Sequence, residues 1–393
     1  MLNTIILLAA IAATFALFAS PLAKSRLWRA TTTPLASIIG SGFLVLGPVL
    51  DKSYGSLAPL VMLALCGVAY LFGAAIRSNI ARLATTAPRS PHALRLETVS
   101  AAALAGAYVV SVAYYLNLFG SFALNLTPLN TPFAAKLLTT AIYMLILITG
   151  WTKGFAALER MEQVSVGLKL AVIAGLLAGL AVAFGQGAVA GTIPRMAPEV
   201  GVWQGITLAF GLIVTVQGFE TSRYLGADYD APTRIRSMVV AQALSTLIYL
   251  AYIVLLTLTD LPRPDILSET AIIDMMAHVA WVLPLMLVAA ALAAQFSAAV
   301  ADTSGSGGLI SDLTHGRLTV RQAYAVLVLG GLALTWTADV FQIINYASRA
   351  FALYYALQAA IAAIGSPHRL HRAGFALLCG LGMAMTLLGT PIE

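Results

Sequence analysis

Charged residues are scarce in this chain of 393 residues: Asp, Glu, Lys and Arg together make up only 10% of it. Soluble domains carry typically about 25%, and the 60% of hydrophobic residues found here exceeds what their surfaces tolerate. The scarcity of charge therefore excludes a soluble protein. Long polar linkers are lacking as well, so we predict a single membrane domain over residues 1–393.

Cysteine and histidine are also rare, with two and five copies in the chain. Cys66 and Cys379 both fall in apolar runs, which excludes a disulfide framework and a cysteine-rich metal site. The histidines fall in polar segments, and the motifs HExxH and GxSxG are missing. We therefore expect no enzyme activity, no cofactor and no bound metal.

Apolar runs long enough to cross the hydrocarbon core as helices recur along nearly the whole chain. We predict an all-α integral membrane protein, embedded in the lipid bilayer through about 12 helices. The predicted spans are residues 2–18, 31–50, 57–76, 99–124, 134–151, 164–184, 202–224, 238–259, 282–311, 320–337, 340–364 and 373–389.

Basic residues are distributed unequally between the loops. Every second loop along the chain belongs to a set that holds 16 Lys and Arg residues in total, and the loops between them hold only four. The positive-inside rule assigns the first set to the cytoplasm, so both termini are expected outside, in a plasma membrane such as the bacterial inner membrane. The net charge of +6 then follows from membrane topology, and we expect no nucleic acid partner. The first run, 2–18, precedes its positive charges, which favours a retained helix over a signal peptide.

Two spans contain residues that suit a helix in lipid poorly. Span 31–50 has Gly40, Ser41 and Gly42 at its centre, and span 202–224 has Gly218 followed by Glu220. Close helix packing explains either glycine cluster taken alone. Four spans separate the two, however, so each cluster lies at the start of a group of five spans, residues 30–184 and 202–364. This pattern predicts a 5+5 inverted repeat whose first and sixth core helices are discontinuous, with additions at 1–29 and 365–393.

Several motifs resemble those of the amino acid, polyamine and organocation (APC) permeases, which have the LeuT-type fold. IIGSGFL at 38–44 is similar to the motif of their first core helix, and QGFETSRYLGADYDAPTRIRSM at 217–238 to that of their sixth. SVAYYLNLFGSF at 111–122 and ISDLTHGRL at 310–318 resemble the third and eighth. The resemblance covers roughly residues 30–364. The chain departs from the family in its extra first span, its single last span, and a separated acidic pair, Asp228 and Asp230.

The resemblance implies a secondary active transporter that moves an amino acid or a related amine by alternating access, as a monomer or homodimer. The residues themselves agree with a zwitterionic substrate. Backbone N–H groups freed at a half-helix N-terminus bind anions, and freed carbonyls accept hydrogen bonds from an amine. The predicted substrate site comprises Ile39, Gly40, Ser41, Gly42, Val216, Gln217, Gly218 and Phe219, with Tyr114 or Tyr115 on the path.

Four ionisable residues within spans are candidates for gating or coupling. Glu220 is either a solvated helix end or a buried gating carboxylate. Lys169 lies close enough to the cytoplasmic end to snorkel, whereas Asp302 is too deep to reach water easily. We hypothesise that Lys169 and Asp302 face each other and make coupling proton-driven. The alternative is a sodium ion held by Asp302, Thr303 and Ser304. Arg349 either pairs structurally or binds an anionic group of the substrate.

Other functional classes remain open to different degrees. No repeated filter sequence supports a channel. Metal-ion carriers of the same general fold present an acidic residue with Asn in the first core helix and Met with His in the sixth, and spans 31–50 and 202–224 lack these pairs. A sensor that binds a nutrient without transporting it is separated from a carrier only by a flux measurement.

Overall fold

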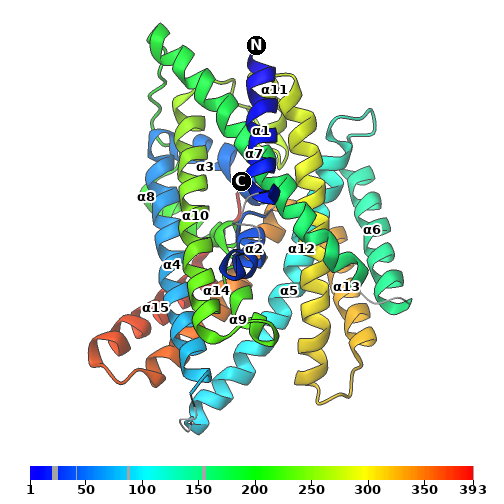
Figure 1. Ribbon diagram of the computed structural model, residues 1–393, viewed down its shortest axis with the longest axis vertical. Helices are drawn as coiled ribbons and strands as arrows, with labels where there is room; N and C mark the ends of the chain where they lie inside the picture. Colours follow the sequence, from blue (N-terminus) through cyan, green and yellow to red (C-terminus); the bar gives the residue numbers. More distant parts are fainter. Residues whose placement is uncertain (20–24, 41, 86–88, 153–155, 393) are drawn as a thin grey trace.

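The computed structural model describes residues 1–19, 25–40, 42–85, 89–152 and 156–392, and its secondary structure over these residues is helical throughout (Figure 1). Eight stretches among them are long and apolar enough to cross a membrane. The prediction of an all-α membrane protein is thus confirmed. The count of about 12 spans and the 5+5 inverted repeat stay predictions.

The helices agree with the predicted spans, apart from their ends and two interruptions. Their bounds are α1 Leu2–Ala19, α2 Arg26–Ile38, α3 Gly42–Tyr54, α4 Ala58–Leu83, α5 Pro91–Asn125, α6 Pro132–Thr152, α7 Ala156–Ala190, α8 Val202–Gly211, α9 Thr221–Tyr224, α10 Ala231–Leu258, α11 Ala271–Ala277, α12 Val282–Leu313, α13 Val320–Thr337, α14 Val340–Gly365 and α15 Arg369–Leu388. Span 31–50 is divided between α2 and α3. Span 202–224 is divided between α8, the 3₁₀ turn η3 (Ile213–Val216) and α9.

Polar side chains fix the starts of several long helices. Ser90 accepts a hydrogen bond from the N–H of Ala93 (3.2 Å) at the start of α5, and Asp230 accepts one from Thr233 (3.0 Å) at the start of α10. Such caps satisfy N–H groups that have no partner in the first turn. Hydrogen bonds from Thr233 also lower the pKa of Asp230, so this cap stays ionised.

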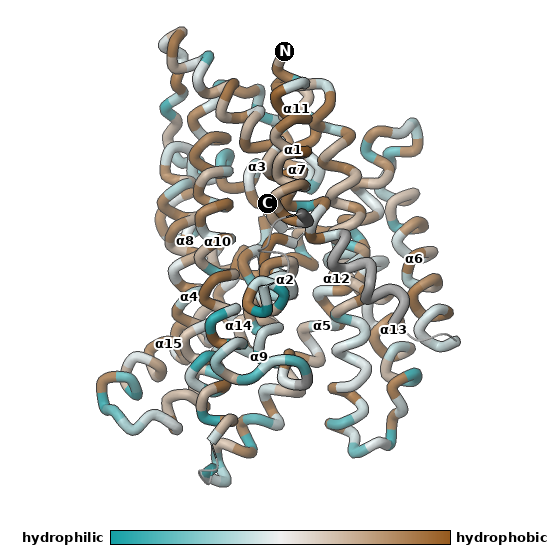
Figure 2. Tube along the Cα trace, viewed as in Figure 1, coloured by the Kyte–Doolittle hydropathy of each residue, from teal (hydrophilic) through white to brown (hydrophobic). Residues whose placement is uncertain are grey.

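The breaks in both discontinuous helices lie in the interior of the bundle, where Phe43 and Val216 are buried. The long helix α5 packs against α12 and α14, while α10 packs against α4 and α2. The additional helix α1 packs on α7, where the fully buried Ile6 lies against Gly175 and Gly179. Helices α6 and α15 lie at the periphery of the bundle (Figure 2). They expose apolar side chains such as Leu145 and Leu377, as expected of surfaces that face lipid.

The two chain ends differ in position. The N-terminus lies at one end of the bundle, and the C-terminal ends of α4 and α12 lie at the opposite end (Figure 1), as the predicted topology requires. The C-terminal segment instead turns into the bundle, where the N–H of Thr390 donates to the Thr207 carbonyl of α8 (3.0 Å). Thr390 therefore packs against α8, and the extracytoplasmic position of the C-terminus stays a prediction. The side of the membrane on which the N-terminus lies stays a prediction.

Candidate functional site

The two helix interruptions meet in the middle of the molecule. Gly218 lies between η3 and α9 with φ 115°, a left-handed conformation that favours glycine. A Cβ atom at Gly218 would lie 2.5 Å from the carbonyl carbon of Ser37 and 2.7 Å from the backbone nitrogen of Ile38. The second interruption therefore packs directly on the end of α2. The predicted breaks near Gly40 and Gly218 are both present, whereas Ser41 falls outside the described residues.

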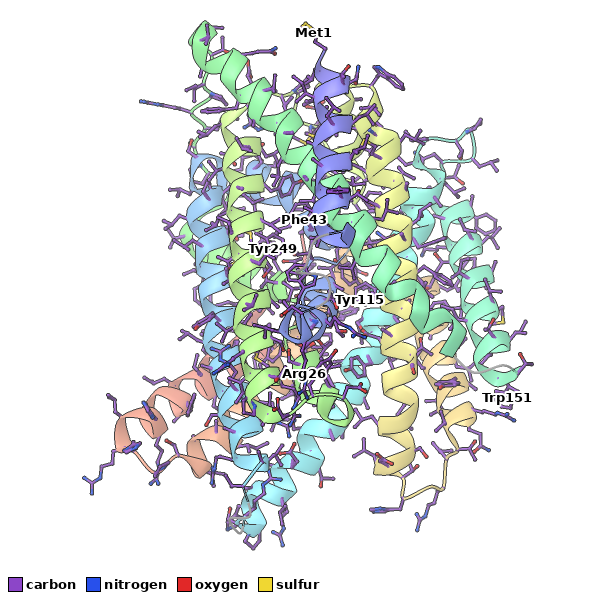
Figure 3. The ribbon with its side chains drawn as sticks, viewed as in Figure 1. Met1, Arg26, Phe43, Tyr115, Trp151 and Tyr249 are labelled. Carbon is purple, nitrogen blue, oxygen red and sulfur yellow. The ribbon has the colours of Figure 1, made fainter. Side chains whose placement is uncertain are left out.

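Tyr249 of α10 joins the two interruptions. Its hydroxyl donates to the carbonyls of Ile38 (3.0 Å) and Thr215 (2.5 Å), one from each broken span. Its ring packs against Phe43 at the start of α3, with the centroids 5.2 Å apart. Figure 3 shows Phe43, Tyr249 and Tyr115 together in the middle of the bundle. Sequence reasoning missed Tyr249, because nothing in its apolar span distinguishes this tyrosine from a packing residue.

Both tyrosines proposed for the path lie at the interruptions. A Cβ atom at Gly42 would lie only 2.8 Å from the Tyr114 hydroxyl and 3.0 Å from the Cα atom of Thr215. Both residues therefore pack closely against Gly42. Tyr115 accepts a hydrogen bond from the Gln217 side chain (2.9 Å). Helix α5 thus contributes polar groups to both interruptions.

The backbone of the second interruption is only partly free. Val216, Gln217 and Phe219 are all buried, and their place in the substrate site stays a prediction. The Phe219 carbonyl, however, accepts a hydrogen bond from the N–H of Ser222 (3.3 Å), so it is engaged and not free as expected. The side-chain oxygen Oε1 of Gln217 is buried and has no hydrogen-bond partner among the described residues. That oxygen is an acceptor available to a ligand.

Glu220 is buried, with 1% of its surface exposed. Its Oε2 accepts hydrogen bonds from the Gly218 N–H (2.9 Å) and from the Tyr355 hydroxyl of α14 (2.8 Å). The Tyr355 ring stacks on Phe219 at 5.0 Å and on Phe72 of α4 at 5.3 Å. The interpretation of Glu220 as a solvated helix end is therefore wrong. Its gating role stays a prediction.

Lys169 and Asp302 line one cavity of about 180 Å³, together with Ser37, Tyr108 and Thr221. The Lys169 ammonium is buried and donates to the Ala36 carbonyl (2.9 Å), where a positive charge is favoured by the C-terminal end of α2. This position excludes snorkelling to the membrane surface.

The hydroxyl groups near Asp302 are already engaged in part. Asp302 is buried and accepts a hydrogen bond from the Ser111 hydroxyl of α5. Thr303 is fully buried and donates its hydroxyl to the Ala299 carbonyl (2.6 Å) of the same helix, and Ser304 follows it. Whether these residues carry the coupling ion stays a prediction.

Arg349 points toward the peripheral helix α15. Its Nε donates to the Thr386 carbonyl (2.6 Å), and the Thr386 hydroxyl approaches the Arg349 carbonyl (3.4 Å). The neighbouring Ser348 points the other way, donating to the Gly211 carbonyl (2.7 Å) and accepting from the Val214 N–H (3.1 Å) at the bend between α8 and η3. The structure therefore favours the structural interpretation of Arg349, and Ser348 is the residue that supports the site.

We expect Arg349→Ala to keep the transport rate close to that of the unmodified protein. The variant loses one charge-assisted hydrogen bond between α14 and α15, so its free energy of unfolding should fall by about 1–3 kcal/mol. Thermal unfolding of the purified protein and flux in proteoliposomes measure the two effects separately. A loss of transport at unchanged stability would instead indicate that Arg349 binds the substrate.

Comparison with known proteins agrees with the two interruptions. A family model described as an APC superfamily transporter matches residues 20–389. The chain belongs to this family. An uncharacterized protein from Aquifex aeolicus (strain VF5) is 39% identical over 388 residues, which cover 96% of this chain and 94% of the relative. The chain is therefore an integral membrane transporter, and APC transporters are not a class of enzymes.

The APC transporter also carries ionic contacts on either side of the interruptions. Toward the end with the basic loops, Arg223 of α9 pairs with Glu97 of α5 and also contacts Gln358 of α14. Toward the other end, Asp51 of α3 pairs with Arg263 in the loop after α10 (2.5 Å). The hydrogen bond that Arg263 donates to Asp51 raises the pKa of Arg263, which keeps the guanidinium charged. The half-helices are thus tied to the surrounding helices at both ends.

Proposed function

We propose that this APC transporter moves an amino acid or a related small organic amine by alternating access, coupled to protons. The observation that carries the proposal is the contact between the two interrupted helices at Gly218 and Ser37. In a bilayer, irregular backbone is tolerated only where protein or a cavity surrounds it. Two such segments in contact favour a binding site over two unrelated packing defects.

The chemistry at the interruptions suits a zwitterion. Helix α3 begins at Gly42, and the N–H groups of its first turn have no partner within the helix, although that of Phe43 donates to the Gly40 carbonyl before it (3.3 Å). They lie at the positive end of the helix dipole, which favours a carboxylate. Gln217 supplies a buried acceptor oxygen for an ammonium group. An amino acid carries both groups, and α5 places the Tyr114 hydroxyl beside Gly42 and the Tyr115 hydroxyl beside Gln217.

Alternating access requires the two ends to open in turn. Separation of α9 from α5 breaks the pair Arg223–Glu97, and separation of α3 from the loop after α10 breaks Asp51–Arg263. Each pair joins a half-helix to a continuous helix or its loop. We infer that opening of one end is compatible with closure of the other.

Proton coupling is proposed from the position of Lys169. Its ammonium holds the end of α2 through the Ala36 carbonyl, inside the cavity that Asp302 also lines. Loss of the proton would remove the charge that stabilises this carbonyl, so proton release and movement of α2 would be linked. A sodium ion at Asp302, Thr303 and Ser304 is the competing mechanism.

The test begins with a thermal-shift screen of the purified protein against amino acids and amines, since a ligand bound by the folded state alone raises its stability. Uptake of the stabilising compound is then measured in proteoliposomes under an outside-acid pH gradient without sodium. We expect uptake that Lys169→Ala abolishes while thermal stabilisation by the compound persists. An absolute requirement for sodium would exclude the proton mechanism, and binding without any uptake would indicate a sensor.

A further inference from the structure

A large apolar groove lies between α4 and α15, away from the interrupted helices. Its volume is about 1280 Å³. Leucine side chains form much of its walls, among them Leu71 of α4 with Leu377 and Leu378 of α15. Leu377 keeps 77% of its surface exposed, so the groove opens outward toward the surrounding lipid. Nothing in the transport proposal uses this groove.

One end of the groove is strongly basic. Arg77 and Arg82 of α4 and His371 of α15 line it. In the described part of the chain, none of the three has a carboxylate within ion-pair distance. Arg77 is held by the Gln242 side-chain oxygen (2.6 Å) and lies over the Tyr70 ring at 4.5 Å, both of which leave its charge in place.

The start of α15 adds to this positive charge. His368 provides no side-chain cap, and the first turn holds no acidic residue. It carries Arg369, His371 and Arg372 instead. Basic side chains at a helix N-terminus add to the positive end of the dipole. The helix start therefore places further positive charge beside the groove.

We propose that the groove binds one anionic membrane phospholipid, with its phosphate between Arg82 and His371 and an acyl chain along Gly374 and Leu378. Basic pockets between membrane helices recognise such headgroups, and the leucine walls match an acyl chain. A second copy of this chain is a poorer occupant. A twofold dimer through this face would bring the same basic residues of both copies together.

Native mass spectrometry of delipidated protein tests the charge requirement. Phosphatidylglycerol is compared with phosphatidylcholine of identical acyl chains. We expect phosphatidylglycerol to bind more tightly, and the double variant Arg82→Gln, His371→Gln to lose at least about fivefold in affinity, the effect of removing the Arg82 charge. The control Arg317→Gln, Arg321→Gln removes two charges from the loop between α12 and α13 and should bind as the unmodified protein does.

A second pair of variants tests the acyl-chain position. Gly374 and Gly380 both lie on α15 with open space beside their Cα atoms, but only Gly374 lines the groove. Gly374→Trp should displace the lipid, whereas Gly380→Trp should leave it bound. Equal affinity for the two lipids, or retention of lipid by Gly374→Trp, would overturn the proposal. A dimer that Gly374→Trp dissociates would identify a second copy as the occupant and would overturn it as well.

Discussion

Gly218→Ala is expected to lower the transport rate by at least about tenfold, because a strained backbone conformation alone costs about 1–3 kcal/mol. The added methyl group would also meet the backbone of Ser37 at 2.5 Å, and backbone atoms cannot turn aside as a flexible side chain can. The two interruptions would be pushed apart, and the site between them would lose its geometry. Initial uptake of the stabilising compound in proteoliposomes, normalised to folded protein, measures the effect.

Gly106→Ala is the matched control for this substitution. Gly106 lies on α5, and a Cβ atom there meets no other heavy atom within 4 Å. The transport rate of the Gly106→Ala variant should equal that of the unmodified protein. Wild-type transport by Gly218→Ala would show that contact between the interruptions is not required for function.

Glu220→Gln is expected to stop most transport while leaving the protein folded. A glutamine oxygen can still accept the hydrogen bonds from the Gly218 N–H and the Tyr355 hydroxyl, so the substitution removes mainly the charge. Hydrogen bonds to a neutral group contribute about 0.5–1.5 kcal/mol, against about 1.5–3 kcal/mol to a charged group, so both bonds weaken and a loss of at least about tenfold in rate is expected. Uptake is measured together with the unfolding temperature.

Tyr355→Phe separates the charge of Glu220 from its hydrogen bonds. The variant keeps the ring that stacks on Phe219 and Phe72 and removes one donor to the carboxylate. We expect a smaller loss of transport than in Glu220→Gln. If Glu220→Gln transports normally and Tyr355→Phe does not, Glu220 serves only to hold the backbone, and its gating role is excluded.

Much of the framework could be predicted from the sequence because it depends on local properties. Long apolar runs specify membrane helices, and Gly40, Gly42 and Gly218 mark the points where those helices break. The burial of Glu220 could not be decided in this way. The uncharged run before Glu220 is long enough to cross the membrane by itself. Only the contact with Tyr355 of α14 shows that Glu220 remains in the interior of the helix bundle.

The residues that hold the site together required the structure, because their partners are distant in sequence. Tyr249 bonds to Ile38 and Thr215, and Ser348 bonds to Gly211 and Val214, across helices that only the fold brings together. The sequence makes Arg349 a candidate for the substrate site, and only the fold shows that its partner Thr386 lies on the peripheral helix α15. A residue pattern within one span predicts which face of that helix is buried, but it does not predict which other helix packs against that face.

The most direct test of a carrier built on two interrupted helices is accumulation of the stabilising compound in sodium-free proteoliposomes under an outside-acid pH gradient. The proposed mechanism predicts uptake above equilibrium in the unmodified protein, loss of that uptake when a protonophore collapses the gradient, and no accumulation by Gly218→Ala. Saturable binding with no accumulation under either a proton or a sodium gradient would contradict it.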